Sequence, residues 1–214
     1  MYHTPYFKEK DRETLLGFMD ENPFAFMAGS FLSGIPVATQ IPVLLEEREG
    51  TLYLQGHIMR NTDHHNAFVE NPNVLMVFTG PDSYVSATWY SDPQEASTWN
   101  YMSVHVSGRI NFMTDEQLIN FMRKLTLKFE QGNTQSSTVY DNLPDSYLNK
   151  TLPAIIGFEM KADNIQNVFK LSQNRDEKSY QNIISNLEQQ GGPSGMVAAE
   201  MRKRQSRLFP EREK

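Results

Sequence analysis

The stretch Thr98-Trp99-Asn100-Tyr101-Met102-Ser103-Val104-His105-Val106-Ser107-Gly108 carries the clearest structural signal in this 214-residue chain. Its side chains alternate in character, as those of a β-strand with two different faces do. One face is apolar and suits a barrel interior: Met102, Val104 and Val106. The other combines aromatic and polar groups: Trp99, Tyr101, Ser103, His105 and Ser107. A face of this second kind indicates a ligand or subunit contact, although ordinary cross-strand aromatic pairs would also produce it.

Strand-like runs separated by short turns lie on both sides of this segment and predict an antiparallel sheet. The expected strands cover residues 24–28, 37–45, 51–57, 74–78, 84–89, 99–112 and 154–160, with a turn at Gly80-Pro81-Asp82. Helices are expected at 11–19, at 63–70 with Asn61 or Thr62 as the cap, after a Thr114 cap, and at 141–150. We therefore predict one β-rich domain over residues 1–175.

A helical C-terminal extension is predicted over residues 176–214, interrupted by Gly191-Gly192-Pro193-Ser194-Gly195. Near its end lies a basic segment, Arg202-Lys203-Arg204-Gln205-Ser206-Arg207, in a chain whose formal net charge is −6. These cations suit the carboxyl end of a solvated helix, or a contact with DNA or a regulatory partner. The acidic remainder of the chain would weakly repel polyanions.

The composition favours a cytoplasmic protein. The chain has no cysteine, so it offers no disulfide, no iron–sulfur cluster and no thiol nucleophile. No apolar run reaches the roughly 20 residues that span a bilayer, and the first residues do not resemble a secretory signal. No metal site is predicted, because His64 and His65 are adjacent on an expected helix and face different directions.

Two segments outside the long strand carry candidate binding groups. Residues 55–63 run from a strand into a helix start, where Gly56 allows close backbone approach and Arg60 can hold two phosphate oxygens. Residues 169–175 gather cationic, hydroxyl and amide donors that suit a phosphate or the polar edge of a heterocycle. A plain strand-to-helix turn and a helix-capping loop remain alternatives for the two segments. No residue is assigned a catalytic role.

At these segments the sequence resembles the PaiB-type family of FMN-binding negative transcriptional regulators. The specific matches are Thr98-Trp99-Asn100-Tyr101 and Lys170-Leu171-Ser172-Gln173-Asn174-Arg175, and weaker ones extend over most of the chain, beginning at Tyr2. Two departures fall in or beside the segment 90–97: Ala87 stands where the family has proline, and Ala96-Ser97 replaces Val-Pro.

The resemblance implies a six-stranded antiparallel split β-barrel with peripheral helices, working as a homodimer with FMN at the subunit interface. By this analogy, Thr39, Gln40, Ile41 and Pro42 would border the isoalloxazine ring through main-chain groups. The phosphate or ribityl chain would be reached by His57, Arg60 and Asn61. Trp99, Asn100, Tyr101 and His105 would line the site from either subunit, with Lys170, Ser172 and Gln173 as further contacts.

Three functions are compatible with these features. The first is an FMN-binding PaiB-like protein that acts as a negative transcriptional regulator, directly or through a partner. The second is an FMN-dependent oxidoreductase acting on a small molecule, for which His105 and Tyr101 could donate to a substrate. The third, and least supported, is a haem-binding split-barrel protein, because no histidine stands out as an axial ligand.

Overall fold

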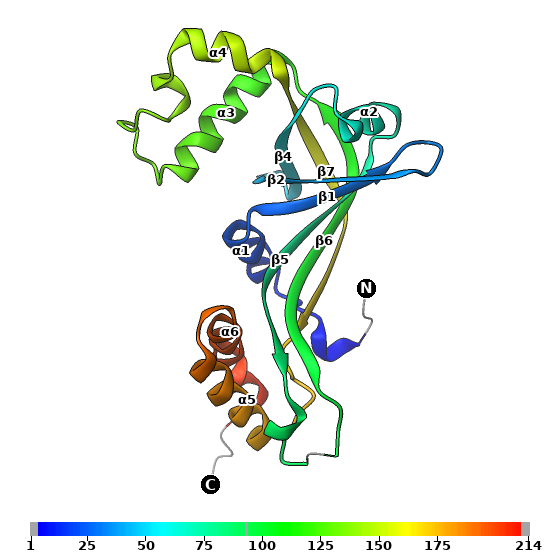
Figure 1. Cartoon of the computed structure of the whole chain (residues 1–214), viewed down its shortest axis with the longest axis vertical. Coiled ribbons are helices and arrows are strands. Elements are labelled where there is room, and N and C mark those ends of the chain that lie inside the picture. The colour runs from blue at the N-terminus through cyan, green and yellow to red at the C-terminus, as the bar shows by residue number, and fades with distance from the viewer. Residues whose placement is uncertain (1–3, 93, 211–214) are drawn as a thin grey trace. The chain divides into compact units, whose positions relative to one another are not determined.

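The computed structural model describes residues 4–92 and 94–210, so Tyr2 of the family match lies outside the described residues. Figure 1 shows the elements. The helices are α1 (Arg12–Glu21), α2 (Asp63–Glu70), α3 (Asp115–Phe129), α4 (Asp145–Thr151), α5 (Glu177–Gln190) and α6 (Gly192–Leu208). The strands are β1 (Phe24–Ser30), β2 (Pro36–Pro42), β3 (Leu44–Arg48), β4 (Thr51–Met59), β5 (Asn73–Val85), β6 (Thr98–Phe112) and β7 (Ile155–Lys170). Short 3-10 helices are η1 (Pro5–Phe7), η2 (Ala87–Trp89), η3 (Tyr140–Asn142) and η4 (Leu152–Ala154).

The strands of the described chain form one sheet in the order β2-β1-β5-β6-β7-β4-β3. The pairs β1–β2, β1–β5, β3–β4 and β4–β7 are antiparallel, which confirms the predicted pairing mode. The sheet has seven strands, so the predicted number of six was wrong. β2 and β3 are its outermost strands, and β2 also lies against β4, where a side chain at Gly56 would meet Ile41.

The extra strand arises near Pro42. The expected strand over 37–45 is divided into β2 and β3, and the amide of Val43 between them donates to the carbonyl of Pro23. Pro42 has no amide hydrogen, so the ladder readily ends at this point. β3 then extends to Arg48, beyond the expected strand end at residue 45, and the chain reverses at Glu49 and Gly50, both with positive φ. Such a two-residue turn matches the twist of an antiparallel hairpin.

The turn predicted at Gly80-Pro81-Asp82 was also wrong, because β5 continues through it to Val85. Gly80 is required for packing: an added Cβ would lie 2.6 Å from a ring carbon of Phe18. The strand expected over 84–89 is the end of β5 followed by η2. β7 is likewise longer than predicted and includes Phe169 and Lys170, which were expected in a loop.

The described chain forms two compact units, and β5, β6 and β7 contribute to both. The first unit comprises residues 1–18, 79–104 and 166–214, and the second comprises 19–78 and 105–165. The predicted division at residue 175 stays a prediction; in the structure α5 and α6 pack with the parts of β5–β7 that belong to the first unit.

In the second unit, α3 packs on the sheet through a cluster formed by Leu44, Leu118, Phe121 and Leu125. The helix begins where predicted, because Thr114 and Gln117 form a reciprocal capping box. α2 also begins and ends as predicted, with Thr62 accepting a hydrogen bond from the amide of His65.

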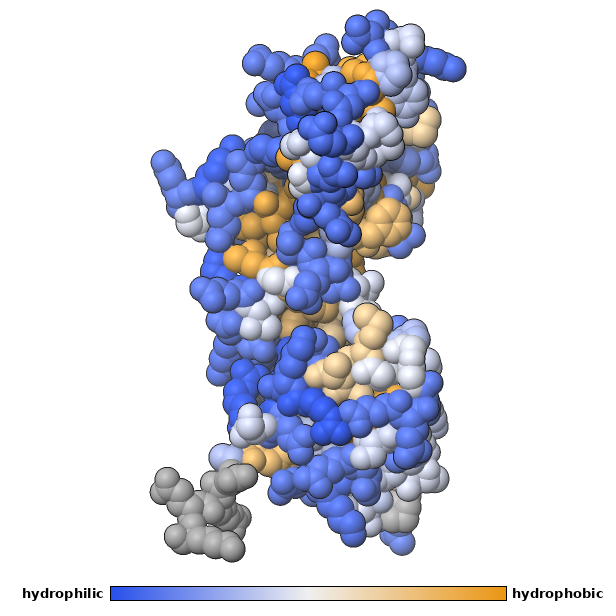
Figure 2. Space-filling model, turned by 90° about the vertical axis from the view of Figure 1, so that its left-hand side faces the viewer, coloured by the Kyte–Doolittle hydropathy of each residue, from blue (hydrophilic) through white to orange (hydrophobic). Residues whose placement is uncertain are grey.

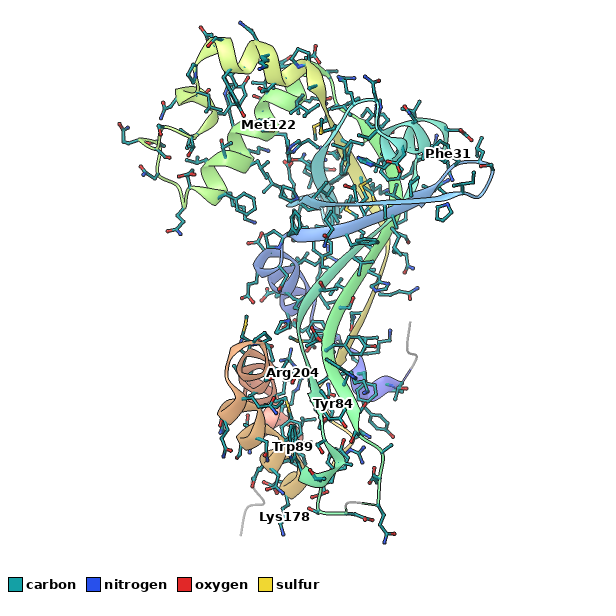
Figure 3. All side chains as sticks on the ribbon, viewed as in Figure 1. Phe31, Tyr84, Trp89, Met122, Lys178 and Arg204 are labelled. Carbon is teal, nitrogen blue, oxygen red and sulfur yellow. The ribbon has the colours of Figure 1, made fainter. Side chains whose placement is uncertain are left out.

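In the first unit, α5 and α6 lie side by side and are joined by Gly191, whose φ is positive (Figure 1). The hydroxyl of Tyr180 donates to the carbonyl of Met201 at 2.8 Å. The buried Arg204 extends from α6 over the ring of Phe169 (Figure 3).

Met102, Val104 and Val106 of β6 are buried, as the alternation predicted.

None of the helices in residues 4–92 and 94–210 has the length and apolar character that crossing a membrane requires. Hydrophilic side chains cover most of the face in Figure 2, with apolar groups in patches among them.

Candidate functional site

The strand-to-helix segment at the end of β4 supplies the strongest candidate for binding an anion. Arg60 follows β4 directly, and its main-chain amide donates to the carbonyl of Ala154. The Nε of its side chain donates to the carbonyl of Ile155 at 2.9 Å. No other partner holds the guanidinium within the described residues, so its terminal nitrogens retain their donors. The guanidinium is thus held through Nε, while its terminal nitrogens are available to a ligand.

A pocket of about 490 Å³ opens beside this arginine. Its walls come from Arg60, Asp115, Leu118, Ile119, Leu152 and Pro153, so one cation faces a mainly apolar lining. An anionic group joined to a flat apolar body suits such a pocket. The carboxylate of Asp115 also reaches the lining, and a bound anion would have to lie on the arginine side of it.

The amino terminus of α2 contributes less than the sequence suggested. Thr62 accepts from the amide of His65, and Asp63 accepts from the amide of His64 at 2.7 Å. Both side chains satisfy donors that an incoming anion could otherwise use. Asn61 has a positive φ of 63°, and its main-chain amide donates to Nδ1 of His65. Anion binding at this segment therefore depends mainly on Arg60.

His57 lies on the face of β4 that α3 covers. Its ring packs against that of Phe121, with 5.8 Å between the ring centroids. Nδ1 is buried and has no hydrogen-bond partner, which is unusual for a buried polar atom. Gly56, next to it, lacks a side chain for a packing reason: an added Cβ would lie 2.7 Å from Cζ of Phe158.

Burial lowers the pKa of His57 below its usual 6.5. The unfolded chain therefore binds a proton at His57 more readily than the folded chain does. The free energy of unfolding falls as the pH drops below about 6.5. We expect His57→Gln to flatten this dependence in urea unfolding measured between pH 7.5 and 5. His65→Gln should flatten the dependence in the same direction, because burial also lowers the pKa of His65. An unchanged slope in His57→Gln would show that His57 takes up a proton as readily in the folded chain as in the unfolded chain.

The four residues expected at the isoalloxazine ring all lie in β2. As an outermost strand, β2 pairs with β1 along one side only, so alternate main-chain groups point away from the ladder. Gln40 is exposed, Thr39 and Pro42 are half-buried, and Ile41 is buried against β4. Such free main-chain donors and acceptors suit the polar edge of a heterocycle.

The predicted site residues divide between the two units. The second unit holds Thr39, Gln40, Ile41, Pro42, His57, Arg60, Asn61 and the half-buried His105. The first unit holds Trp99, Asn100, Tyr101, Lys170, Ser172 and Gln173. In the first unit, Lys170 contacts Trp99 and Ser172 contacts Asn100, whereas in the second unit His57 faces α3 and Ile41 packs on the opposite face of β4, beside Gly56. The assignment of all these residues to FMN stays a prediction.

Within the first unit, Trp99 is 53% exposed and packs edge-on against Tyr84, with 6.1 Å between ring centroids. Lys170 donates to the hydroxyl of Thr98 and to the carbonyl of Trp99. Burial lowers the pKa of Lys170. These groups combine an aromatic surface with a nearby cation.

Asn100 and Ser172 are buried and bound to each other: the hydroxyl of Ser172 donates to Oδ1 of Asn100 at 3.0 Å. The amide nitrogen of Asn100 points to the sulfur of Met201, at 3.4 Å. Asn100 shares the parity of Met102 along β6, so alternation alone placed it on the buried face. Gln173 accepts from the amide of Leu171 and donates to the carbonyl of Phe169. In this structure the side chains of Asn100, Ser172 and Gln173 form hydrogen bonds within the protein.

The sequence did not assign the pocket walls Leu118, Ile119, Leu152 and Pro153 to a site. The first two were recognised only as part of an apolar helix face, and no local pattern links Leu152 and Pro153 to Arg60. In the described part of the chain, no group of three His, Cys, Asp or Glu side chains is arranged to hold a metal ion.

Comparisons with known proteins agree on this fold and family. A family model described as "Putative FMN-binding domain" matches residues 1–164. The Bacillus subtilis protein named "Protease synthase and sporulation protein PAI 2" is 31% identical over 201 residues, which are 94% of this chain and 96% of that protein.

Two solved structures share the fold. A FAD- and haem-binding protein from Mycobacterium smegmatis matches with a TM-score of 0.57 and 24% identity, over 76% of this chain and 72% of its own. The flavocytochrome Anf3 from Azotobacter vinelandii also matches with a TM-score of 0.57, at 20% identity, over 79% of this chain and 72% of its own. The fold is therefore the split β-barrel type of flavin-binding proteins, and the chain belongs to the PaiB-type FMN-binding family.

Proposed function

We propose that the chain is a cytoplasmic, homodimeric PaiB-like regulator that binds FMN. The observation that carries the FMN part is Arg60, which is anchored to the carbonyl of Ile155 and leaves its terminal donors in a largely apolar pocket. The phosphate of FMN approaches a dianion at neutral pH, and a guanidinium can hold two of its oxygens at once. Bound FMN would supply one- or two-electron redox chemistry.

The chain's own residues would then have separate tasks. Arg60 would bind and orient the phosphate. Outward-pointing main-chain groups of Thr39–Pro42 would donate to, and accept from, the polar edge of the ring. Burial lowers the pKa of His57, and its unpartnered Nδ1 can accept or donate one hydrogen bond.

The regulatory part rests on the 31% identity to the Bacillus subtilis sporulation protein over nearly the whole chain. We propose that regulation acts through a protein partner. The cations of the C-terminal basic segment already face carboxylates: Arg202 faces Glu188, Lys203 faces Glu200, Arg204 faces Glu200 and Glu9, and Arg207 faces Glu9. Paired cations release fewer counterions when they approach DNA.

Transcript levels test this role directly. We expect a host that lacks the protein to show raised levels of a defined set of transcripts, and the wild-type chain to restore them. A chain carrying Arg60→Ala should fail to restore them if FMN binding is required. An identical transcript profile with and without the protein would refute the regulatory role while leaving FMN binding intact. Purified protein that binds duplex DNA with a steep salt dependence would refute the partner route.

The dimer proposal rests on an exposed apolar face of β1 and β2. Phe24 is 58% and Phe26 43% exposed, and their cross-strand partners are Pro42 and Gln40. Two exposed phenylalanine rings on one face favour burial against a second copy. This face adjoins Thr39–Pro42, so a dimer formed through it would place the second copy beside the proposed flavin edge.

Light scattering after size-exclusion chromatography should give twice the mass of one chain. We expect the double variant Phe24→Glu/Phe26→Glu to be monomeric, because four carboxylates would meet across the interface. Val69→Glu, at another exposed apolar position of the second unit, should remain dimeric. A folded double variant that keeps the dimer mass would place the interface elsewhere, and a monomeric wild-type chain would refute the dimer.

A further inference from the structure

A second pocket of the second unit is lined by none of the residues predicted to hold FMN. Its volume is about 300 Å³, at the small end of the roughly 300–1,000 Å³ typical of small-molecule pockets. It is lined by Glu46, Arg48, Gln55, Asn111, Phe112, Met113, Gln117, Asn120, Phe121, Lys124 and Glu159. Most of these side chains are polar, and they divide into a sheet wall and a helix wall.

The sheet wall presents hydrogen-bond acceptors. The amide nitrogen of Gln55 donates to Glu46 at 2.9 Å and to Glu159 at 2.8 Å. Because two carboxylates require the nitrogen on that side, the orientation of the amide is settled, and Oε1 must point the other way. Gln55 is only 8% exposed, and its oxygen has no hydrogen-bond partner within the described residues. Gln55 therefore presents a solvent-accessible acceptor on the side away from the two carboxylates.

Both carboxylates of the sheet wall are fixed in place. Arg48 pairs with Glu159 at 2.5 Å and also covers the ring of Tyr53. Burial opposes ionisation of Glu159, but hydrogen bonds from Arg48 and Gln55 outweigh it and lower its pKa. Lys124 lies 3.5 Å from Glu46. The four charged groups balance, so the pocket favours a ligand without net charge.

The helix wall presents donors. Gln117 uses its oxygen to accept from the amide of Thr114, which leaves its NH₂ group available. Asn120 uses its oxygen to accept from Arg123, which leaves its NH₂ group available as well. The ammonium of Lys124, on the same helix, adds a cation whose side chain is 59% exposed.

From this division of donors and acceptors we propose that the pocket binds a small zwitterion of the α-amino-acid type. Its ammonium group would lie against Glu46 and Glu159, and its carboxylate against Gln117, Asn120 and Lys124. Phe112, Met113 and Phe121 would contact the side chain. The proposal is independent of FMN binding, since none of these residues is assigned to the flavin.

The test uses the full-length protein and the standard L-amino acids as probes, each alone at millimolar concentration. Thermal unfolding should identify at least one amino acid that raises the midpoint, and calorimetric titration should show saturation at one molecule per chain. The N-acetylated form of that amino acid, which has no ammonium group, should bind at least about tenfold more weakly.

The double variant Gln117→Leu/Asn120→Leu removes the two amide donors, and circular dichroism verifies that it is folded, because Gln117 also belongs to the capping box of α3. It should weaken binding by roughly tenfold or more and leave FMN titration unchanged. Gln135→Leu, an exposed position outside the pocket, is the matched control and should bind as the wild type does. If no amino acid binds, or if the double variant binds as tightly as the control, the proposal is wrong.

Discussion

Replacement of Arg60 by alanine is expected to weaken FMN binding by roughly 100-fold or more. Two hydrogen bonds from a guanidinium to a phosphate dianion are charge-assisted, and each such bond contributes about 1.5–3 kcal/mol. Within residues 4–92 and 94–210 no hydrogen bond or ion pair holds the terminal nitrogens of Arg60, so both are available to the ligand. Arg60→Lys should retain part of the affinity, because it keeps the charge and loses the two-pronged geometry.

Arg109→Ala is the matched control for this prediction, since Arg109 is an exposed cation of β6 in the same unit. Quenching of flavin fluorescence provides the affinity, and circular dichroism verifies that each variant is folded. Equal dissociation constants for Arg60→Ala and Arg109→Ala would remove Arg60 from the binding site.

Replacement of Gly108 by alanine is expected to destabilise the protein by about 3 kcal/mol, at or above the upper end of the usual cost of overpacking. An added Cβ would lie 2.1 Å from the carbonyl oxygen of Lys161 and 2.9 Å from Cγ of Met160. The first contact is with main chain, so no side-chain rotation can relieve it. β6 and β7 would have to separate locally, and both strands contribute to the two units.

Gly17→Ala is the control, and it should change the free energy of unfolding in the opposite direction. Gly17 lies inside α1, where nothing stands within 4 Å of an added Cβ. Alanine there should stabilise the protein by about 0.5–1 kcal/mol, because it restricts the unfolded chain and favours the helix. Denaturant unfolding of both variants gives the two free energies. A Gly108→Ala protein as stable as the wild type would mean that the two strands are not held at this spacing.

Local signals predicted the parts of the fold that depend on neighbouring residues. Thr62 and Thr114 cap the helices they precede, and the alternation in β6 buries Met102, Val104 and Val106. The turn predicted at Gly80-Pro81-Asp82 was wrong because the turn preference of these residues is local. Gly80 leaves room for Phe18, and β5 continues past it to Val85. The true end of β7 could not be read because its later residues gain their burial from distant parts of the chain.

The candidate site could be predicted only in part, because some of its residues come from distant parts of the chain. Arg60 stood out because it follows a strand and precedes a capped helix. Leu152 and Pro153, which complete its pocket, lie about ninety positions further along the chain and carry no local mark. Gln55 stood at the start of the candidate segment 55–63, but its contacts with two carboxylates from other strands could not be read from the sequence.

Parallel fluorescence titrations of the purified full-length chain with FMN and with riboflavin test the central claim most directly. The two ligands share the isoalloxazine ring and differ in the phosphate that Arg60 is proposed to hold. The account predicts saturation at one FMN per chain and riboflavin binding that is weaker by roughly tenfold or more. Equal affinity for both ligands, or no binding of FMN, would contradict it.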